Sequence, residues 1–507
     1  TDGKKSALLV CAAVIFLCVA GQARAFSLEE RVKKYTLENG MRVIMLERGQ
    51  SPTISLTVRF RAGAVDENIG ITGTAHLLEH MLFKGTQTLG TKNYAEEEKI
   101  LGRIDSLMQA VETEKAKGDK ADKDFLKYLE DNLKTVQAEH QQLVVKDEIG
   151  FIYSQNGGVG FNASTSQDTT AYVISLPSNR LELWARIESD RILNPVLREF
   201  YSERDVILEE RRRSVDSSPG RKLWENFLGA AFMAHPYGRP IIGWPSDIAS
   251  LEKTRTEGFF RAYYSPANTV LTIVGDVRPE EALPVIRKYF ERIPAQPVPP
   301  PLRTREPEQQ GERRVEVLSD SSPEVLIGFH KPGPPAPDDS VCEVIEGILS
   351  YGRSSRLYRR LVEDEKIALR ASASNGSPGE RYANLFVVSA APRRPHTAAE
   401  LEKKLLEELE RLKKDPVGEE ELQRVKNQIQ TELLRNLGSN ASLSHWLSYG
   451  ECVFGDWKYI LERMKSMDKV TAEDVLRVSR KYFSPGNRTV AALVSKPDTP
   501  DQGGKRQ

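Results

Sequence analysis

A short repeat near the end of each half is the sequence feature that most constrains the fold of this chain of 507 residues. Residues 261–268 read RAYYSPAN, and residues 480–487 read RKYFSPGN. Each copy follows a helical pattern and precedes an apolar run typical of a buried strand, Val270 to Val274 and Val490 to Val494. One supersecondary unit that recurs in this way indicates two domains of one ancestral design.

A proline-rich stretch at residues 294–312 separates the two halves. It holds Pro297 and the run Pro299 to Pro301 among charged residues, a composition with too little apolar content for a core and suited to a stiff, extended linker. We therefore expect an N-terminal domain at 26–293, a C-terminal domain at 313–497 and a flexible tail at 498–507.

Each half mixes strand and helix patterns. Alternating β-branched runs, such as residues 42–46 and 54–60, give way to helical patterns, such as 399–413 and 419–437. The mixture predicts the α+β class, with a mainly antiparallel sheet covered by helices in each of two related domains.

The N-terminus has the form of a secretory signal peptide. Lys4 and Lys5 precede an apolar run at residues 7–20, and Ala23-Arg24-Ala25 supplies a small-x-small end, so we expect cleavage after residue 25. The apolar run is short for a membrane span, which predicts an exported protein, periplasmic or secreted, with no stable membrane span after cleavage.

The charge balance limits the kinds of partner that we expect, and the cysteine content limits the disulfide chemistry. The 72 basic and 72 acidic residues balance, so no global field favours nucleic acid or an acidic membrane surface. Past the expected cleavage point only Cys342 and Cys452 remain. They could form a disulfide in an exported protein, but we expect two buried free thiols.

The run HLLEH at residues 76–80 predicts a metal site. Residues four apart lie on the same face of a helix, so His76 and His80 can reach one ion, while Glu79 leans over the adjacent edge. The spacing is the inverse of the commoner H-E-x-x-H zinc signature. Two His leave a tetrahedral zinc in need of one more protein ligand and an open position for water.

The third ligand is expected in the acidic helical segment at residues 203–210, which alone would read as a solvated charged helix. Glu203 and Glu210 are seven residues apart and share a face, whereas Glu209 is turned by about 100° from Glu210. We therefore take Glu210 as the ligand and Glu203 as an acid behind the site that orients or tunes it. The expected cofactor is one Zn²⁺ per chain, although this ligand set would also accept Co or Mn.

These residues resemble the pitrilysin/insulinase family of zinc peptidases, which includes mitochondrial processing peptidase. Residues 73–86 look like the family's active-site helix, and residues 203–210 resemble its second motif, whose last acid is the zinc ligand. Residues 160–166 and 168–172 are similar to the strand beside the zinc, and residues 235–238 also match a family segment. The resemblance implies a chain that forms half of a clamshell chamber, enclosed when a second pair of domains joins it.

One departure from the family is the distance from His80 to Glu210, which is longer than usual. The excess lies at about residues 103–156, which are dense in Lys, Glu and Asp with Leu at helical intervals and are interrupted at Lys117 to Lys120. The pattern predicts a helical hairpin. We expect a solvated surface insertion, with a lid or docking arm as the alternative.

A second departure concerns an Arg and a Tyr that hold the substrate backbone in family members that complete catalysis. Aligned on Ser355-Arg356-Leu357, their positions are occupied by Val362 and Leu369, which cannot donate a hydrogen bond. An oxyanion without such donors loses transition-state stabilisation. Our hypothesis is that a related polypeptide supplies the pair in a heterodimer; a homodimer that uses other donors is the alternative.

The second domain is expected to be catalytically silent. Counting back from the second copy of the repeat places the counterpart of the metal-site helix near residues 351–357, a segment with no His and no acid suited to zinc.

The resulting hypothesis is a zinc-dependent endopeptidase that cleaves unfolded peptides or exported protein segments. Glu79 would take a proton from the attacking water and return it to the leaving amine, with Glu203 in support. Asn162 and Ala163, on the strand beside the zinc, would offer main-chain hydrogen bonds to an extended substrate. The alternative is a non-catalytic peptide-binding or scaffold subunit of the same family.

Overall fold

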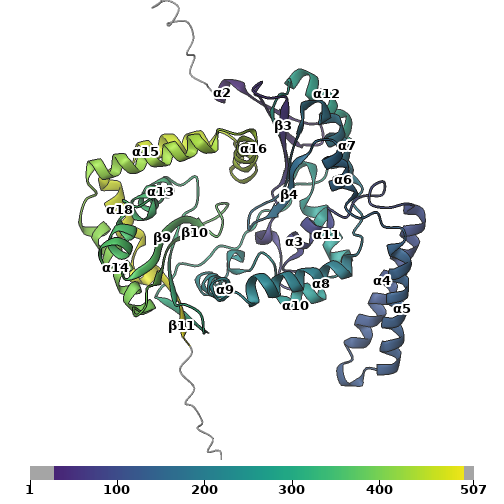
Figure 1. The fold of residues 1–507 in the computed structure, drawn as a ribbon, viewed down its shortest axis with the longest axis horizontal. Helices are drawn as coiled ribbons and strands as arrows, with labels where there is room; N and C mark the ends of the chain where they lie inside the picture. Colours follow the sequence, from purple (N-terminus) through teal and green to yellow (C-terminus); the bar gives the residue numbers. More distant parts are fainter. Residues whose placement is uncertain (1–27, 496–507) are drawn as a thin grey trace, which may run out of the picture.

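The computed structural model describes residues 28–495. The expected signal peptide at 1–25 and the tail at 498–507 lie outside the described residues. Within them are two sheets, each with its own covering helices (Figure 1).

The first sheet has the order β1-β2-β6-β3-β5-β4, antiparallel except for the parallel pair β2 and β6. Its strands are β1 Val32–Thr36, β2 Arg42–Glu47, β3 Thr53–Phe60, β4 Val159–Thr165, β5 Thr170–Pro177 and β6 Thr269–Gly275.

The second sheet has the order β7-β11-β8-β10-β9, antiparallel except for the parallel pair β7 and β11. Its strands are β7 Arg313–Ser319, β8 Glu324–Lys331, β9 Ala368–Ser377, β10 Asn384–Pro392 and β11 Arg488–Ser495. Strand for strand this is the order of the first sheet without β1, which confirms the expected α+β pair of related domains.

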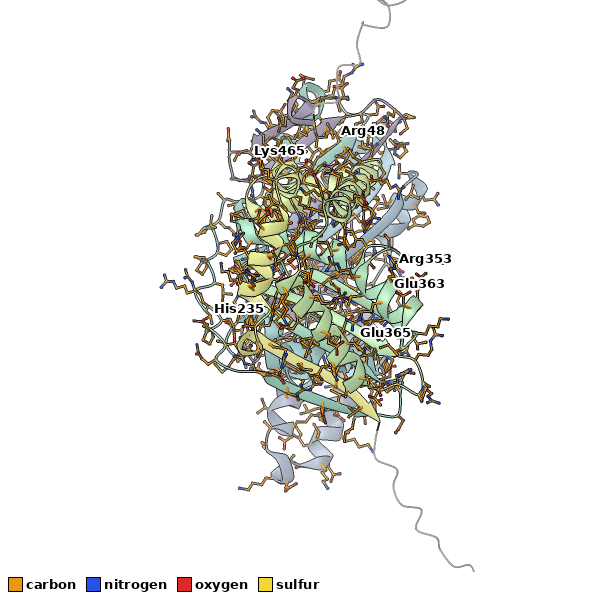
Figure 2. All side chains as sticks on the ribbon, turned by 90° about the vertical axis from the view of Figure 1, so that its left-hand side faces the viewer. Arg48, His235, Arg353, Glu363, Glu365 and Lys465 are labelled. Atoms are coloured by element: carbon orange, nitrogen blue, oxygen red, sulfur yellow. The ribbon has the colours of Figure 1, made fainter. Side chains whose placement is uncertain are left out.

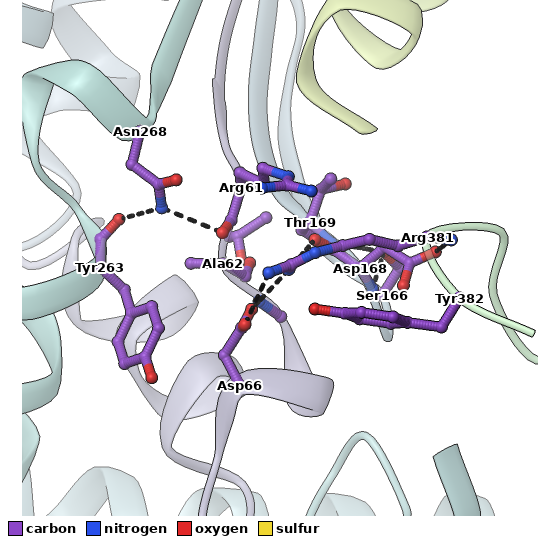
Figure 3. A network of polar contacts seen from close by, with 12 residues as sticks. Arg61, Ala62, Asp66, Ser166, Asp168, Thr169, Tyr263, Asn268, Arg381 and Tyr382 are labelled. Carbon is purple, nitrogen blue, oxygen red and sulfur yellow. Dashed lines mark hydrogen bonds and ion pairs between the residues drawn. The ribbon is translucent and has the colours of Figure 1, made fainter. Parts of the chain in front are cut away.

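In each domain the repeated octapeptide joins a helix to an interior strand of the sheet. It links α11 (Lys253–Tyr263) to β6 and α18 (Ala472–Tyr482) to β11. In the first copy the Asn268 side-chain amide donates to the carbonyls of Tyr263 and Arg61, at 2.7 and 2.9 Å (Figure 3). In the second copy Asn487 donates to the carbonyls of Tyr482 and His330, at 2.9 and 2.8 Å. In both copies the Asn therefore fastens a helix end to a neighbouring strand end.

The remaining helices cover the sheets or connect them. In the N-terminal half they are α2 Leu28–Arg31, α3 Thr74–Met81, α4 Tyr94–Lys115, α5 Lys123–Gln141, α6 Glu148–Gln155, α7 Leu181–Leu193, α8 Phe200–Arg211, α9 Pro219–Ala231, α10 Pro245–Ser250 and α12 Pro279–Phe290. In the C-terminal half they are α13 Pro337–Ser350, α14 Ala398–Lys414, α15 Glu419–Asn436, α16 Asn440–Tyr449 and α17 Tyr459–Asp468.

The two domains exchange helices. Helix α16, from the C-terminal half, packs against β3 and β6 of the first sheet, where Leu443 and Leu447 join the buried cluster of Ile44 and Val270. Helix α9, from the N-terminal half, packs against β7 and β11 of the second sheet. Each sheet therefore has one face buried by the other half of the chain.

Polar contacts at the junction reinforce this exchange (Figure 3). Arg381, in the turn between β9 and β10, pairs its guanidinium with both carboxylate oxygens of Asp66 at 2.8 and 2.9 Å. The main-chain N–H groups of Glu380 and Arg381 donate to Asp168 at 2.7 and 3.2 Å, and Tyr237 Oη donates to the other Asp168 oxygen at 2.6 Å. Buried carboxylates of the first domain thus hold a loop of the second.

Residues 294–312 contain no helix or strand, and β7 begins directly after them at Arg313. The stretch is nevertheless attached to the first domain, because the Glu306 carboxylate accepts the main-chain N–H groups of Met233, Ala234 and His235 at 2.8, 2.9 and 3.0 Å.

Helices α4 and α5 form a hairpin that projects from the first domain (Figure 1). The hairpin runs from Tyr94 to Gln141, so it begins and ends earlier than the expected range 103–156, and α6 follows as a separate helix. Its base is fixed by the buried carboxylate of Glu97, which accepts from Arg198 Nε at 2.6 Å and lies 2.9 Å from His140 Nε2. This anchored base explains why a strongly charged segment holds a defined position.

Cys342 and Cys452 are both buried and free, which confirms the expectation of two thiols. None of the helices in the described part of the chain is long and apolar enough to cross a membrane.

Shortening a buried side chain on an exchanged helix is expected to destabilise both domains together. Leu443→Ala removes a fully buried side chain from the α16 contact with the first sheet and should lower the free energy of unfolding by about 2–5 kcal/mol. Leu434→Ala, on the exposed side of α15, should change it by less than about 0.5 kcal/mol. Chemical denaturation followed by circular dichroism measures both, and equal stabilities would contradict the packing role of α16.

Burial of His235 predicts acid sensitivity at the domain junction. Burial lowers the pKa of His235 to about 4, from about 6.5 in an unfolded chain. Between these values the unfolded state binds the extra proton, so this group's contribution to stability falls as the pH drops from about 6.5 to about 4.

His235→Phe removes this titration. The free energy of unfolding of the variant, relative to that of the wild type, should therefore rise as the pH falls from about 6.5 to about 4. Urea denaturation of both proteins at several pH values measures the difference. A difference that does not change with pH would contradict the expectation.

Candidate metal centre

Helix α3 is fixed at its N-terminus by close backbone packing. Gly73 has a φ of 90°, and a Cβ placed there would lie 2.6 Å from the Ile242 carbonyl oxygen. The buried Glu67 carboxylate accepts the N–H groups of Gly73 and Ala75 at 2.9 and 2.7 Å, which satisfies free donors of the first turn. Leu77 and Leu78 are fully buried. The helix can therefore neither rotate nor slide.

The opposite face of α3 brings together the side chains expected from the sequence. His76 Nε2 lies 3.8 Å from one oxygen of Glu210 on α8, and His80 Nε2 lies 3.6 Å from the other. One ligand atom from each of the three residues lies within 4.8 Å of the others, the only such group in the part of the chain that the structure describes.

These three residues fit a zinc ion. Zn–N and Zn–O bonds of about 2.1 Å at tetrahedral angles place ligand atoms about 3.4 Å apart, and each imidazole Nε2 lies near this distance from one of the two Glu210 oxygens. The donor set of two imidazoles and one carboxylate is a catalytic rather than a structural combination, because it leaves a fourth position open.

The protonation of the two imidazoles differs. Burial lowers the pKa of His76 to about 4, with a smaller effect from His80, so His76 is neutral at physiological pH. Burial also acts to lower the pKa of His80, but its hydrogen bond to Glu203 and the charge of that carboxylate outweigh burial and raise the pKa. A proton on His80 Nδ1, facing Glu203, leaves Nε2 free to bind a metal.

Glu203 lies behind the site, as expected. Its Oε1 is 2.9 Å from His80 Nδ1, and its Oε2 is 2.6 Å from Lys84 Nζ, which also reaches Glu199 at 3.2 Å. Although burial acts to raise the pKa of Glu203, these two partners lower it, so the carboxylate is ionised. Glu203 therefore fixes both the orientation and the tautomer of His80.

Glu209 is directed away from the two His side chains. Its carboxylate pairs with Arg212 and Arg213 at 2.7 and 2.5 Å on the exposed side of the helix. The helical periodicity thus distinguishes Glu210 from its neighbour in sequence.

Glu79 is placed beside the cluster by strand β4. Its Oε2 accepts a hydrogen bond from Thr165 Oγ1 at 2.6 Å, and burial raises its pKa. A carboxylate with a raised pKa is a better proton acceptor, and the Thr165 contact orients it.

Asn162 and Ala163 lie on β4, the last strand of the first sheet. They pair on one side with Val173 and Tyr172 of β5. The other side of β4 faces no strand among the described residues, so its main-chain groups form a free sheet edge next to Glu79.

A cleft of about 780 Å³ opens in front of the cluster and is lined by both domains. His76, Glu79 and Glu210 form one wall. Further contributors that sequence reasoning missed include Trp224 and Leu228 on the exchanged helix α9 and residues 376–378 at and just after the end of β9. Nothing in the sequence signals these contacts, because they depend on how the two domains pack.

The counterpart of α3 in the second domain is α13, which corrects the expected position at residues 351–357. Helix α13 follows β8 as α3 follows β3, and it contacts β9 and α15 as α3 contacts β4 and α8. Glu346 on α13 accepts the Asn375 N–H of β9 at 3.0 Å, in the manner of Glu79 and Thr165. With Glu346 as the counterpart of Glu79, the distance to the repeat is 134 residues (480 − 346) instead of 182 (261 − 79), so the expected segment lay just beyond the helix.

Val362 and Leu369 lie in the second domain, apart from the metal centre. Val362 belongs to the helical turn Tyr358–Asp364 and is next to Glu363, labelled at the side of that domain in Figure 2. Leu369 is on β9, with 58% of its side chain exposed.

Two family models match the chain. One described as insulinase (peptidase family M16) matches residues 42–115 and 146–244, and one described as the peptidase M16 inactive domain matches residues 250–429. The gap in the first match contains α5, the second helix of the projecting hairpin.

Individual proteins agree with these matches. The zinc protease PqqE of Helicobacter pylori is 27% identical over 497 residues, which cover 96% of this chain and 98% of that protein. A probable mitochondrial-processing peptidase subunit beta of Arabidopsis thaliana is 22% identical, with coverage of 92% and 79%. A solved structure of a protease from Helicobacter pylori superposes with a TM-score of 0.76 at 25% identity, with coverage of 92% and 100%.

The contrast between two adjacent acids provides a test of the metal centre. Glu210→Gln should abolish stoichiometric zinc binding, because it removes a charged oxygen ligand, whereas Glu209→Gln should leave it intact. Glu203→Gln should weaken zinc affinity by about 10–100-fold. Metal analysis and chelator competition measure these effects, and equal zinc content in the Glu209 and Glu210 variants would refute the assignment.

Proposed function

The chain belongs to the insulinase family of peptidases, family M16, and on that premise we propose that it is a zinc-dependent endopeptidase that cleaves unfolded peptides or exported protein segments. The observation that carries the proposal is the convergence of His76, His80 and Glu210 beside Glu79 at a cleft. A scaffold subunit would have no need of this arrangement.

The proton transfers fall to Glu79. Zinc held by His76, His80 and Glu210 would supply the Lewis acidity that makes water a nucleophile at neutral pH. Glu79 takes the proton of the attacking water and, as its conjugate acid, passes it to the leaving amine. Thr165 Oγ1 keeps the carboxylate aimed at the reacting atoms, and Glu203 holds His80 in position.

The free edge of β4 suits an extended substrate. A peptide that adds as a further strand would bond to the main-chain groups near Asn162 and Ala163 and bring a peptide bond to Glu79. Because this binding mode needs an accessible backbone, it selects unfolded segments over folded proteins.

A second, related chain would supply the donors that Val362 and Leu369 cannot. An unstabilised oxyanion costs on the order of 3 kcal/mol of transition-state stabilisation, which is enough to make the single chain a poor catalyst. The Arabidopsis relative is itself named as a subunit, which supports a heterodimer. A homodimer would have to draw its donors from other side chains.

Export is proposed from residues 1–25 alone, which have the composition of a signal peptide.

Hydrolysis of a quenched, unstructured peptide tests this function. We expect little activity from the zinc-loaded chain alone and at least about a hundredfold more when it is mixed with a related chain that carries the Arg/Tyr pair. Glu79→Gln should lower the activity of the mixture by about 10²–10⁴-fold while retaining zinc.

The outcomes separate the alternatives. Full activity of the chain alone would refute the heterodimer, and bound zinc without activity in either sample would indicate a peptide-binding subunit. Unchanged activity in the Glu79→Gln mixture would refute the assigned role of Glu79.

A further inference from the structure

A second cavity, of about 250 Å³, lies in the C-terminal domain on the face of α13 that corresponds to the metal-bearing face of α3. Its lining comes from α13, α15, α17 and the end of α16, with Asn375 of β9. It contains no His, so the second domain keeps the position of the site with a different set of side chains.

Carboxylates outnumber basic groups in this cavity. Glu343, Glu346 and Glu432 line it together with one cation, Arg463. Arg463 is already committed, because it pairs with Glu343 at 2.5 Å and with Glu380 at 3.2 Å. Among the described residues neither Glu346 nor Glu432 forms an ion pair, and the Glu346 carboxylate accepts only the Asn375 N–H.

The buried carboxylate of Glu346 therefore lacks a counter-charge. Burial raises its pKa to about 7, although the hydrogen bond from the Asn375 N–H acts to lower it; the charges of Glu343 and Glu432 add to the rise, and that of Arg463 opposes it. The Asn375 side chain points its amide nitrogen towards Asp339, at 3.3 Å from a carboxylate oxygen, and its own Oδ1 is buried in the cavity lining without a partner. The Glu346 carboxylate and Asn375 Oδ1 can therefore both accept a hydrogen bond from a ligand in the cavity.

Aromatic rings form the remaining wall. The cavity is lined by Tyr351, Trp446, Tyr449, Phe454 and Tyr459. The Phe454 ring centroid lies 3.9 Å from that of Tyr459 and 5.8 Å from that of Tyr449, so the rings form a continuous surface. Aromatic faces attract cations, and they do so most strongly where water is excluded.

We propose that this cavity binds an alkyl ammonium or alkyl guanidinium group, with Glu346 as the counter-ion, Asn375 Oδ1 as a further acceptor and the aromatic rings around the alkyl chain. A cavity of about 250 Å³ is below the range typical of drug-sized ligands and suits a single side chain or a short diamine.

The ligand has two possible sources with the same chemistry. Asn375 lines this cavity, and residues 376–378 directly after it line the catalytic cleft. A peptide bound in the cleft could therefore place a lysine or arginine side chain here; this source rests on the proposed peptidase function. A free diamine or agmatine would bind independently of that function.

Isothermal titration of the full-length Glu79→Gln protein separates these questions, because its binding sites are retained while the proposed hydrolysis is removed. The probes are 1,5-diaminopentane, agmatine and an unstructured peptide with one lysine, against 1,5-pentanediol and the same peptide with norleucine as neutral controls. We expect saturable binding of the cationic amines and none of 1,5-pentanediol. The lysine peptide should bind more tightly than the norleucine peptide, which can still add to the free edge of β4.

Added in this background, Glu346→Gln should weaken binding about tenfold or more, because it removes a charge-assisted contact. Glu363→Gln, at an exposed position of the same domain, should leave it unchanged. Trp446→Leu provides a second variant should Glu346→Gln fail to fold, as judged by circular dichroism, and it should also weaken binding.

Binding of the lysine peptide alone would identify a substrate side chain as the source, and binding of the free amines alone would identify a small-molecule site. Equal binding of cationic and neutral probes, no saturable binding, or unaltered affinity in folded Glu346→Gln would overturn the proposal. None of these outcomes depends on whether the wild-type chain hydrolyses peptides.

Discussion

Burial of each sheet by a helix from the opposite half of the chain is the constraint on which the rest of the structure depends. Helix α16 covers the first sheet through Leu443 and Leu447, and α9 covers the second through Phe227. The site where Phe227 meets the sheet is Gly328, and a Cβ there would lie 2.4 Å from the ring. Each sheet has one face that its own half does not cover, so the cleft between the domains has walls of fixed separation.

Within that frame, buried carboxyl groups and their partners position the candidate metal centre. The Glu67 carboxylate fastens the start of α3, and Glu203 with Lys84 orients His80 from behind. A further buried pair, Glu97 and Arg198, holds the loop after α3, since the Arg198 guanidinium also donates to the Lys84 and Leu89 carbonyls at 3.0 and 3.1 Å. The hairpin insertion supplies Glu97 and is therefore connected to the metal centre through these contacts.

The two domains share one architecture but differ in the side chains that they place at the equivalent site. Helices α3 and α13 occupy equivalent places and each directs a Glu, Glu79 or Glu346, towards the corresponding strand. In the first domain the neighbouring side chains are His, placed where they could hold a metal ion, and in the second they are aromatic rings and acids. Two domains that share a sheet order and an Asn-anchored repeat thus carry different side chains at the same position.

Much of this organisation follows from the sequence. Helical periodicity placed His76, Glu79 and His80 on one face and distinguished Glu210 from Glu209, and the repeated octapeptide indicated two related domains, because these signals are local. The tertiary structure alone decided the exchange of α9 and α16, the contact of Thr165 with Glu79, and the place of α13 as the counterpart of α3. These features depend on contacts between distant residues, such as that of Arg42 with Glu451, 409 positions apart. Periodicity specifies which side chains share a face, but only packing decides which face they meet.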